Sequence, residues 1–180
     1  MKETLTFKYF QMQPTPWFKR KFTPITNNGS LPSIIERLEG TPIRLEQKVL
    51  QYADEFLIQH EGDDWSIQEH TGHLLNLEWL WYARITDIIN GEAYLTEADL
   101  TNAATYEAKY NEQSIEAILD AFIEVRNQLV NLLRSIKVTD LNKQSLHPRL
   151  QTPMKLIDLA YFIAEHDDHH LAMIHGLTQK

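Results

Sequence analysis

The apolar positions of this chain of 180 residues recur at helical spacing in four separate regions. In the first, about residues 31–57, apolar side chains return every three or four positions. Ser30 is placed to act as its N-cap, and Pro32 lies in its first turn. Pro42 interrupts the region, so we expect a kink or a split there, with Thr41 capping the second half.

The second and third regions predict helices with clear boundaries. The second opens with "SIQE" at residues 66–69, which is a capping box, and continues to a stop at Asn90 and Gly91. The third, from Ile115 to Ile136, keeps a 3.6-residue period throughout, with polar residues on the opposite face. Between the two lies a long polar connection, residues 91–113, so a simple up-down topology is not required.

The fourth region follows a loop, and we expect Thr152 as its N-cap, Pro153 at its first helical position and an end near Gly176. No stretch shows a convincing strand pattern. Four amphipathic helices without strands predict an all-α four-helix bundle. We expect an irregular N-terminal arm, residues 1–30, and a single bundle domain, residues 31–180.

Composition narrows the class of partner. The chain has 17 basic and 25 acidic residues and a formal net charge of −8, which argues against nucleic acid as a partner. The one short basic segment, residues 17–21, we interpret as a solvated arm. No cysteine is present, so any metal must be held by imidazole, carboxylate or carbonyl groups. Neither a signal peptide nor a membrane span is recognisable, so we expect a cytoplasmic protein with no membrane partner.

Histidines cluster in the fourth region, in "AEHDDHHLAMI". His166 and His170 are four residues apart and point the same way along the edge of the apolar face. Two such imidazoles can bind one cation, or each can be a hydrogen-bonded boundary histidine. The second region offers a third imidazole, His70 or His73, both on its apolar side. Three imidazoles from two helices leave coordination positions open, which is typical of catalytic metal sites.

Two segments carry a resemblance to a known family. They are "WSIQEHTGHLLNLE", residues 65–78, and "HPRLQTPMKLIDLAYFIAEHDDHHLAMI", residues 147–174. The first is similar to a W-S signature followed by H-L, and the second to a last helix that carries H-x-x-x-H. "LPSIIERLEGTP" also fits the family's first helix. On these motifs, over most of residues 31–176, the chain resembles the DinB/YfiT-like superfamily of metal-dependent four-helix-bundle enzymes.

The resemblance implies an up-down-down-up bundle and places three metal ligands on His73, His166 and His170. It also implies a divalent metal ion, with zinc or nickel favoured, and a homodimer. The chain departs from the family at Asn76, where many relatives carry an acid. Glu78 is the nearby acid that could take over its role.

The function expected on this basis is that of a metal-dependent enzyme acting on a small molecule. Two reactions fit: hydrolysis, and transfer of a low-molecular-weight thiol. In the second, a cosubstrate must supply the thiol, because the chain has no cysteine. No catalytic residue beyond the ligands is assigned. The alternative is a non-catalytic, metal-stabilised dimeric bundle that acts as a binding or interaction module.

Other residues give weaker signals. One of Asp167, Asp168 and His169 could accept an imidazole N–H, while the other two face solvent. His147 fits a surface position or the lip of the site, and Arg84 is expected at the surface, with an anionic substrate as its alternative partner. The aromatic residues of the second region, expected in the core or at a dimer interface, are Trp79, Trp81 and Tyr82.

Overall fold

The computed structural model describes residues 14–179. Four long helices form the bundle: α1 (Leu31–Val49), α3 (Ile67–Asn90), α5 (Ile115–Ser135) and α6 (Leu156–Leu177). The shorter elements are α2 (Asp54–Leu57), α4 (Ala103–Glu107), β1 (Gln144–Leu146), β2 (Pro153–Lys155) and 3-10 turns at Trp17–Lys19, Asn28–Ser30, Tyr110–Glu112 and Val138–Asp140. The expected N-terminal arm lies partly outside the described residues; its described part, 14–30, is irregular apart from two of these turns.

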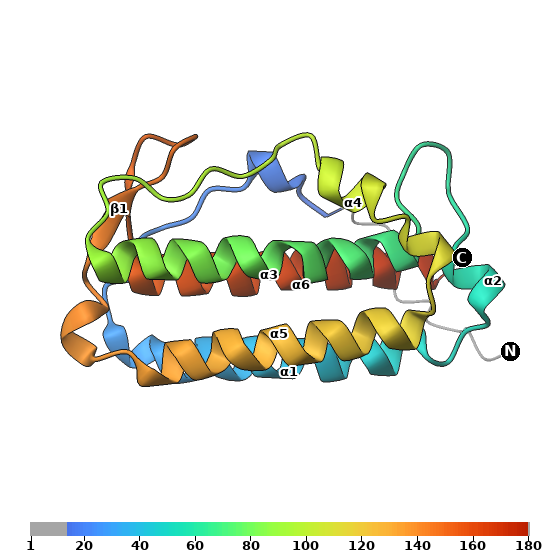
Figure 1. The fold of residues 1–180 in the computed structure, drawn as a ribbon, viewed down its shortest axis with the longest axis horizontal. Helices are drawn as coiled ribbons and strands as arrows, with labels where there is room; N and C mark the ends of the chain where they lie inside the picture. The colour runs from blue at the N-terminus through green and yellow to red at the C-terminus, as the bar shows by residue number, and fades with distance from the viewer. Residues whose placement is uncertain (1–13, 180) are drawn as a thin grey trace, which may run out of the picture.

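The bundle has the up-down-down-up order that the family resemblance implies. Figure 1 shows α1 and α6 running in one direction and α3 and α5 in the other. Each of α3 and α1 packs against both α5 and α6. Because α3 and α5 are parallel, the chain must return along the bundle between them, and residues 91–114 make this crossing (Figure 1). The long polar connection is therefore a consequence of topology, and it brings α4 over α3.

Of the kink or split expected at Pro42, the split is wrong, because α1 continues through Pro42 and ends at Val49. Thr41 is buried inside the helix and is not a cap. Proline has no N–H, so the carbonyl of Leu38 loses the donor that a helix normally provides. Arg126 on α5 supplies a replacement: its Nη1 donates to that carbonyl at 3.0 Å. A tertiary hydrogen bond thus compensates for the local defect.

The predicted boundaries of α3 are confirmed. The Ser66 hydroxyl accepts from the backbone N–H of Glu69 at 3.1 Å, and the Glu69 carboxylate accepts from the Ser66 N–H at 2.8 Å. Gly91 ends the helix with a φ of 76°, a left-handed conformation that glycine adopts without strain. Both signals are local, so the chain sequence alone places the start of the helix that carries His70 and His73.

The expected start of the last helix is wrong, and so is the expectation of no strands. Residues 144–146 and 153–155 form an antiparallel hairpin in which Leu146 is opposite Pro153, and α6 begins after it. Thr152 therefore precedes the hairpin's second strand, and Pro153 is the first residue of that strand. Proline is accepted at the first residue of an edge strand as well as at the start of a helix, so the dipeptide was ambiguous.

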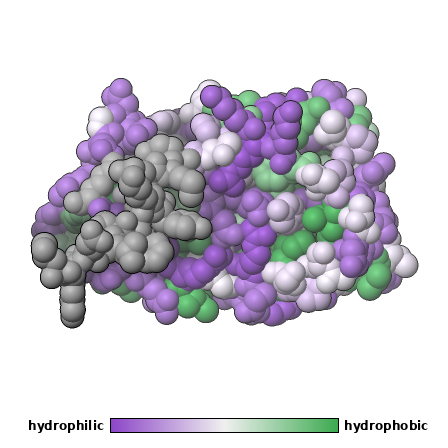
Figure 2. All heavy atoms as spheres, turned by 180° about the vertical axis from the view of Figure 1, so that it is seen from behind, coloured by the Kyte–Doolittle hydropathy of each residue, from purple (hydrophilic) through white to green (hydrophobic). Residues whose placement is uncertain are grey.

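The core consists of two apolar clusters along the bundle, one around Leu38 and Ile163 and the other around Leu45 and Phe122. Figure 2 shows the face behind that of Figure 1, where hydrophilic side chains dominate and apolar ones lie in scattered patches. None of the described helices combines the length and the apolar sequence that crossing a bilayer requires.

Candidate metal centre

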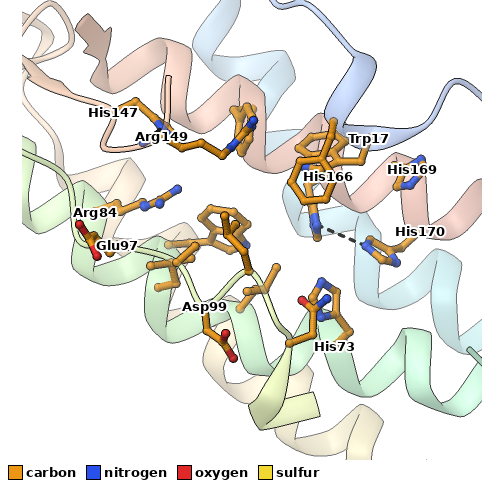
Figure 3. A pocket seen from close by; sticks show the side chains of 18 of the residues that line it. Trp17, His73, Arg84, Glu97, Asp99, His147, Arg149, His166, His169 and His170 are labelled. Atoms are coloured by element: carbon orange, nitrogen blue, oxygen red, sulfur yellow. Dashed lines mark hydrogen bonds between the residues drawn. The ribbon is translucent and has the colours of Figure 1, made fainter. Parts of the chain in front are cut away.

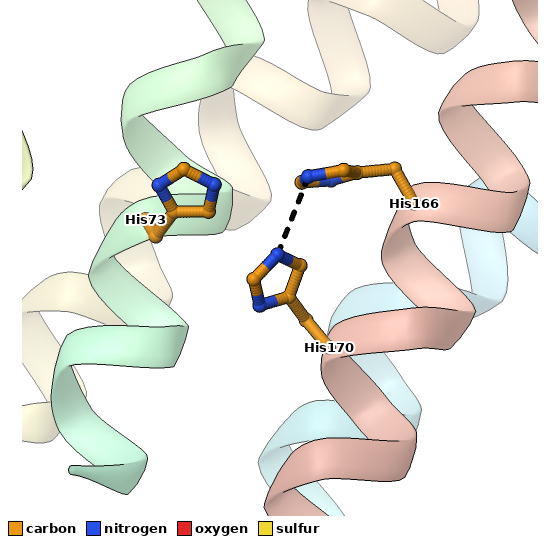
Figure 4. A group of neighbouring side chains, drawn as sticks. All are labelled: His73, His166 and His170. Atoms are coloured by element: carbon orange, nitrogen blue, oxygen red, sulfur yellow. Dashed lines mark hydrogen bonds between the residues drawn. The ribbon is translucent and has the colours of Figure 1, made fainter. Parts of the chain in front are cut away.

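Three histidines from two helices converge inside the bundle. His73 on α3 and His166 and His170 on α6 are buried, and each offers a ring nitrogen within 4.8 Å of the other two (Figure 4). The Nε2 atoms of His166 and His170 are 3.3 Å apart. Two nitrogen ligands of a tetrahedral zinc ion, each at about 2.0–2.1 Å from it, also stand roughly 3.3 Å apart. The spacing therefore fits two ligands of one ion.

Hydrogen bonds at the opposite ring nitrogens orient two of these imidazoles. The Nδ1 of His73 lies 3.1 Å from the Thr105 hydroxyl, and the Nδ1 of His170 lies 2.9 Å from the Nδ1 of His70. Such bonds leave Nε2 of each ring for a ligand, as in most metal-binding histidines. His70, the other histidine considered in the sequence, thus contacts His170 from outside the three-nitrogen group. The Nδ1 of His166 is buried without a hydrogen-bond partner among the described residues.

Asn76 acts on the histidines only indirectly. Its Nδ2 lies 3.5 Å from the Thr105 hydroxyl, and its Oδ1 accepts from the Tyr110 hydroxyl at 2.6 Å. Tyr110 packs directly on Gly72, where a Cβ atom would lie 2.1 Å from the tyrosine ring. Glycine at position 72 lets the ring of Tyr110 approach α3. The Tyr110 hydroxyl in turn holds Asn76 next to the Thr105 hydroxyl, which orients His73.

Burial keeps the four clustered imidazoles uncharged. It lowers the pKa of His70 and of His73 to about 4 and the pKa of His166 and of His170 well below the ordinary 6.5. The rings are therefore neutral at pH 7 without any partner ion. Neutral imidazole is the form that binds a cation, so protons do not compete with a metal at this site near neutral pH.

A cavity of about 450 Å³ adjoins the histidines and opens to the surface (Figure 3). Its volume is in the range of small-molecule sites. The walls are mostly aromatic and aliphatic and are formed by Trp17, Trp65, Leu77, Leu80, Trp81 and Phe162. Trp17 contacts the ring of His166, with 4.8 Å between centroids, so the interpretation of residues 17–21 as a solvated arm is wrong for this residue. Trp65 covers His73 in the same way, at 4.6 Å.

The flanking acidic residues do not bind the histidines. Asp167 is fully buried and pairs with Arg126, while the half-buried Asp168 pairs with Arg37 and Arg44. His169 is half-buried at the edge of the cavity. Among the described residues, no carboxylate forms a hydrogen bond with His73, His166 or His170.

Two other sequence expectations need correction. Arg84 was expected at the surface, yet only 2% of its area is exposed and it lines the cavity. Glu78 is buried in an ion pair with Arg126, so it does not replace the missing acid at position 76. For His147, of the two expected positions the surface is wrong, because it is buried and lines the cavity. Of the aromatic residues expected in the core or at a dimer interface, Trp81 is in the core, and Trp79 and Tyr82 are exposed. Thr105 carried no signal in the sequence, because a polar connection gives no indication of the element that it will pack against.

Comparisons with known proteins agree with this architecture. A solved structure of YfiT from Bacillus subtilis, described as a probable metal-dependent hydrolase with an unusual four-helix bundle topology, is similar with a TM-score of 0.77 and 21% sequence identity. The likeness covers 89% of this chain and 92% of that chain. No curated protein matches this chain in sequence. The model of the DinB superfamily matches residues 34–174, and the chain belongs to that superfamily.

Proposed function

We propose that this protein is a metal-dependent enzyme that hydrolyses a small molecule, with His73, His166 and His170 as the metal ligands. The observation that carries the proposal is that three neutral, buried imidazoles face a cavity large enough for a substrate. A structural zinc site is closed by four protein ligands, whereas three histidines leave a position free. The description of YfiT as a probable metal-dependent hydrolase supports the same class of reaction.

Each group of residues has a part in this proposal. The three imidazoles hold a divalent ion, with zinc or nickel favoured by an all-nitrogen donor set. Such an ion, when bound, lowers the pKa of a coordinated water or thiol and polarises a substrate carbonyl. His70 and Thr105 keep two of the rings in position through their hydrogen bonds. The aromatic walls exclude bulk water and contact the apolar part of the substrate.

Thiol transfer is the second candidate, and it is favoured because no carboxylate among the described residues is hydrogen-bonded to the three histidines. Glu78 and Asp167 are both paired with Arg126, and no described carboxylate bonds to the three histidines. Activating water requires removal of a proton from a weak acid, whereas a thiol with a pKa near 8.5 ionises more readily. Because the chain lacks cysteine, the thiol would be a cosubstrate.

A non-catalytic, metal-stabilised dimeric bundle is the alternative to both enzymes. The exposed Trp79 and Tyr82, three residues apart on α3, are the aromatic side chains that a homodimer could cover. This alternative predicts that removing the metal lowers stability, while the metal-loaded protein transforms neither esters nor thiols.

The first test is metal content by inductively coupled plasma mass spectrometry, on untagged protein purified without a nickel column. We expect about one ion per chain in the wild type and its loss in His73→Ala, His166→Ala and His170→Ala. His70→Ala is the matched control: it removes a buried imidazole of the same helix that lies outside the three-nitrogen group. We expect it to keep the metal, with affinity weakened roughly 10- to 100-fold.

Reconstitution and turnover then separate the candidates. A folded wild type that cannot be loaded with zinc or nickel would overturn the enzyme proposal. Loaded protein is assayed with chromogenic esters, and separately with glutathione, cysteine or bacillithiol plus an electrophile. Metal-dependent ester cleavage supports the hydrolase, and metal-dependent loss of thiol supports the transferase.

A further inference from the structure

We propose that the end of the cavity opposite the histidines binds a carboxylate, so that the ligand is a small monocarboxylic acid with an apolar body. Arg84 is the central group of this anion site. The acid is a substrate only if the proposed function holds. Its binding to Arg84 does not require that function, because it requires no metal. Figure 3 shows Arg84, His147 and Arg149 together on one side of the cavity and the three clustered histidines on the other.

Arg84 is a buried cation that forms no salt bridge with any described carboxylate, although the charge of Asp87 acts to raise its pKa. Its one hydrogen bond among the described residues runs from Nε to the carbonyl of Thr96, at 2.8 Å, and no described carboxylate forms an ion pair with it. Burial lowers its pKa to about 10, so it remains charged at neutral pH. A charge taken out of water needs a partner. The Arg84 guanidinium lies over the ring of Trp81, with 5.7 Å from Cζ to the ring centroid, but its two terminal nitrogens have no hydrogen-bond partner among residues 14–179. They line the cavity, where a bound anion can reach them.

Further donors surround the same end of the cavity. The Nδ1 of His147 accepts from the backbone N–H groups of Arg149 and Leu150, each at 3.3 Å, so its proton is on Nε2. The indole N–H of Trp81, whose ring lies between Arg84 and His166, is buried without a partner among the described residues. Arg149 lies at the mouth, over the ring of Phe18. This end of the cavity therefore offers hydrogen-bond donors in excess of acceptors.

Two acidic residues also line the cavity and set a limit on the charge of the ligand. The carboxylate of Asp99 already accepts from the Thr101 hydroxyl and from two backbone N–H groups of residues 101 and 103. Glu97 is exposed and forms no ion pair with Arg84. Their negative charges oppose a dianion such as phosphate more strongly than a carboxylate with one charge. Planar guanidinium is suited to a carboxylate, which it binds through two parallel hydrogen bonds.

The separation of His73 and Arg84 along α3 indicates how long the apolar part of the ligand must be. His73 and Arg84 are eleven residues apart, which places them on the same face of the helix with a rise of about 16 Å between them. Leu77, Leu80 and Trp81 line the interval. A ligand that reaches both ends therefore needs an apolar section between its carboxylate and the group that faces the histidines.

The test is isothermal titration calorimetry on protein freed of metal with EDTA, so that no cation can attract the acid. The probes are phenylacetate, 3-phenylpropanoate and 4-phenylbutanoate, each compared with its neutral amide. We expect at least one acid to bind the wild type tenfold or more tightly than its amide. Arg84→Gln should abolish that preference, and Arg149→Gln should weaken it by a smaller factor.

Control variants separate the anion site from net charge and from misfolding. Arg134→Gln removes the same charge from an exposed ion pair with Glu39 and should leave binding unchanged. Glu97→Gln should leave it unchanged or tighten it. Thermal melts identify any variant that does not fold, and for such a variant Arg84→Lys, which keeps the charge, replaces Arg84→Gln and should retain part of the preference.

Three results would overturn the proposal: no acid binds the wild type, acids and amides bind equally, or Arg84→Gln and Arg134→Gln behave alike. The outcome is separable from that of the metal test. If His73→Ala loses the metal and keeps the preference for acid, both proposals stand; if the wild type binds acid but no metal, only the metal proposal fails.

Discussion

Two buried arginines on neighbouring helices differ in the hydrogen-bond and ion-pair partners that surround their guanidinium groups. Arg126 on α5 and Arg84 on α3 expose only 1% and 2% of their area. The Arg126 guanidinium bonds to Glu78 at 2.6 and 3.0 Å and to Asp167 at 2.5 and 3.1 Å. The Arg84 guanidinium has one hydrogen-bond partner among the described residues, the carbonyl of Thr96. Burial by itself would lower the pKa of Arg126, but the charges of Asp167 and Glu78 outweigh it and raise that pKa.

The difference separates a structural role from a binding role. Arg126 joins all four long helices, because Leu38 belongs to α1, Glu78 to α3 and Asp167 to α6. Asp167 directly follows His166, so this polar cluster also holds the helix turn that carries the histidine. Among the described residues, Arg84 forms no hydrogen bond or ion pair with another long helix, and it faces the cavity. A buried charge that the fold neutralises stabilises the fold, and one that it leaves unpaired is available to a ligand.

Arg126→Met is expected to change stability more than any substitution of Arg84. The substitution removes the cation that neutralises the buried carboxylates of Glu78 and Asp167, of which Asp167 keeps the Thr41 hydroxyl as a donor, and it removes the donor to the Leu38 carbonyl. We expect the free energy of unfolding to fall by about 3–5 kcal/mol, measured by urea denaturation. A loss no greater than that of the equivalent Arg84 variant would contradict the assignment of the two roles.

A much smaller effect is expected from Arg84→Gln in the absence of ligand. The variant removes a buried charge that forms no salt bridge with any described carboxylate, and glutamine can still donate to the Thr96 carbonyl. We expect the free energy of unfolding to change by less than about 1 kcal/mol, in either direction. The same urea titration measures it, and a loss of the size expected for Arg126→Met would show that Arg84 has an internal partner.

The smallest effect concerns the pKa of His147, which burial and then the charges of Arg84 and Arg149 lower to about 4. The unfolded chain takes up this proton at higher pH than the native protein, so the contribution of His147 to stability is complete above about pH 6.5 and is lost as the pH falls towards 4. Arg84→Gln should raise this pKa, while Arg134→Gln should not. NMR titration of the imidazole Cε1–H signals measures both, and equal values in the two variants would break the link between Arg84 and His147.

Local patterns were sufficient for much of the fold. The capping box at Ser66, the left-handed glycine at position 91 and the period of residues 115–136 depend on neighbours within a few positions, and the structure has helices at each. The hairpin depends on pairing between residues 144–146 and 153–155 and could not be recognised from strands three residues long. The continuity of α1 through Pro42 depends on Arg126, more than eighty residues away.

Part of the candidate site could be predicted from the sequence. The spacing of His166 and His170 placed both on one side of a helix, and family resemblance selected His73 over His70; that these residues bind a metal remains our proposal. The groups that orient them, Thr105 and His70, come from contacts between elements and left no periodic signal. Arg84 was expected at the surface because arginine usually is, and nothing in its local sequence indicates that it is buried.

The helical class of this protein, most of its helix boundaries and the face on which its histidines lie follow from hydrogen bonds and side-chain directions within a few turns, so they can be predicted from local sequence. Which buried charges have partners follows only from the packing of distant segments. Arg126 and Arg84 are each an arginine on an amphipathic helix, and no local feature distinguishes them. Their surroundings do, because the energy of a buried charge depends on groups that the fold brings to it from distant parts of the chain.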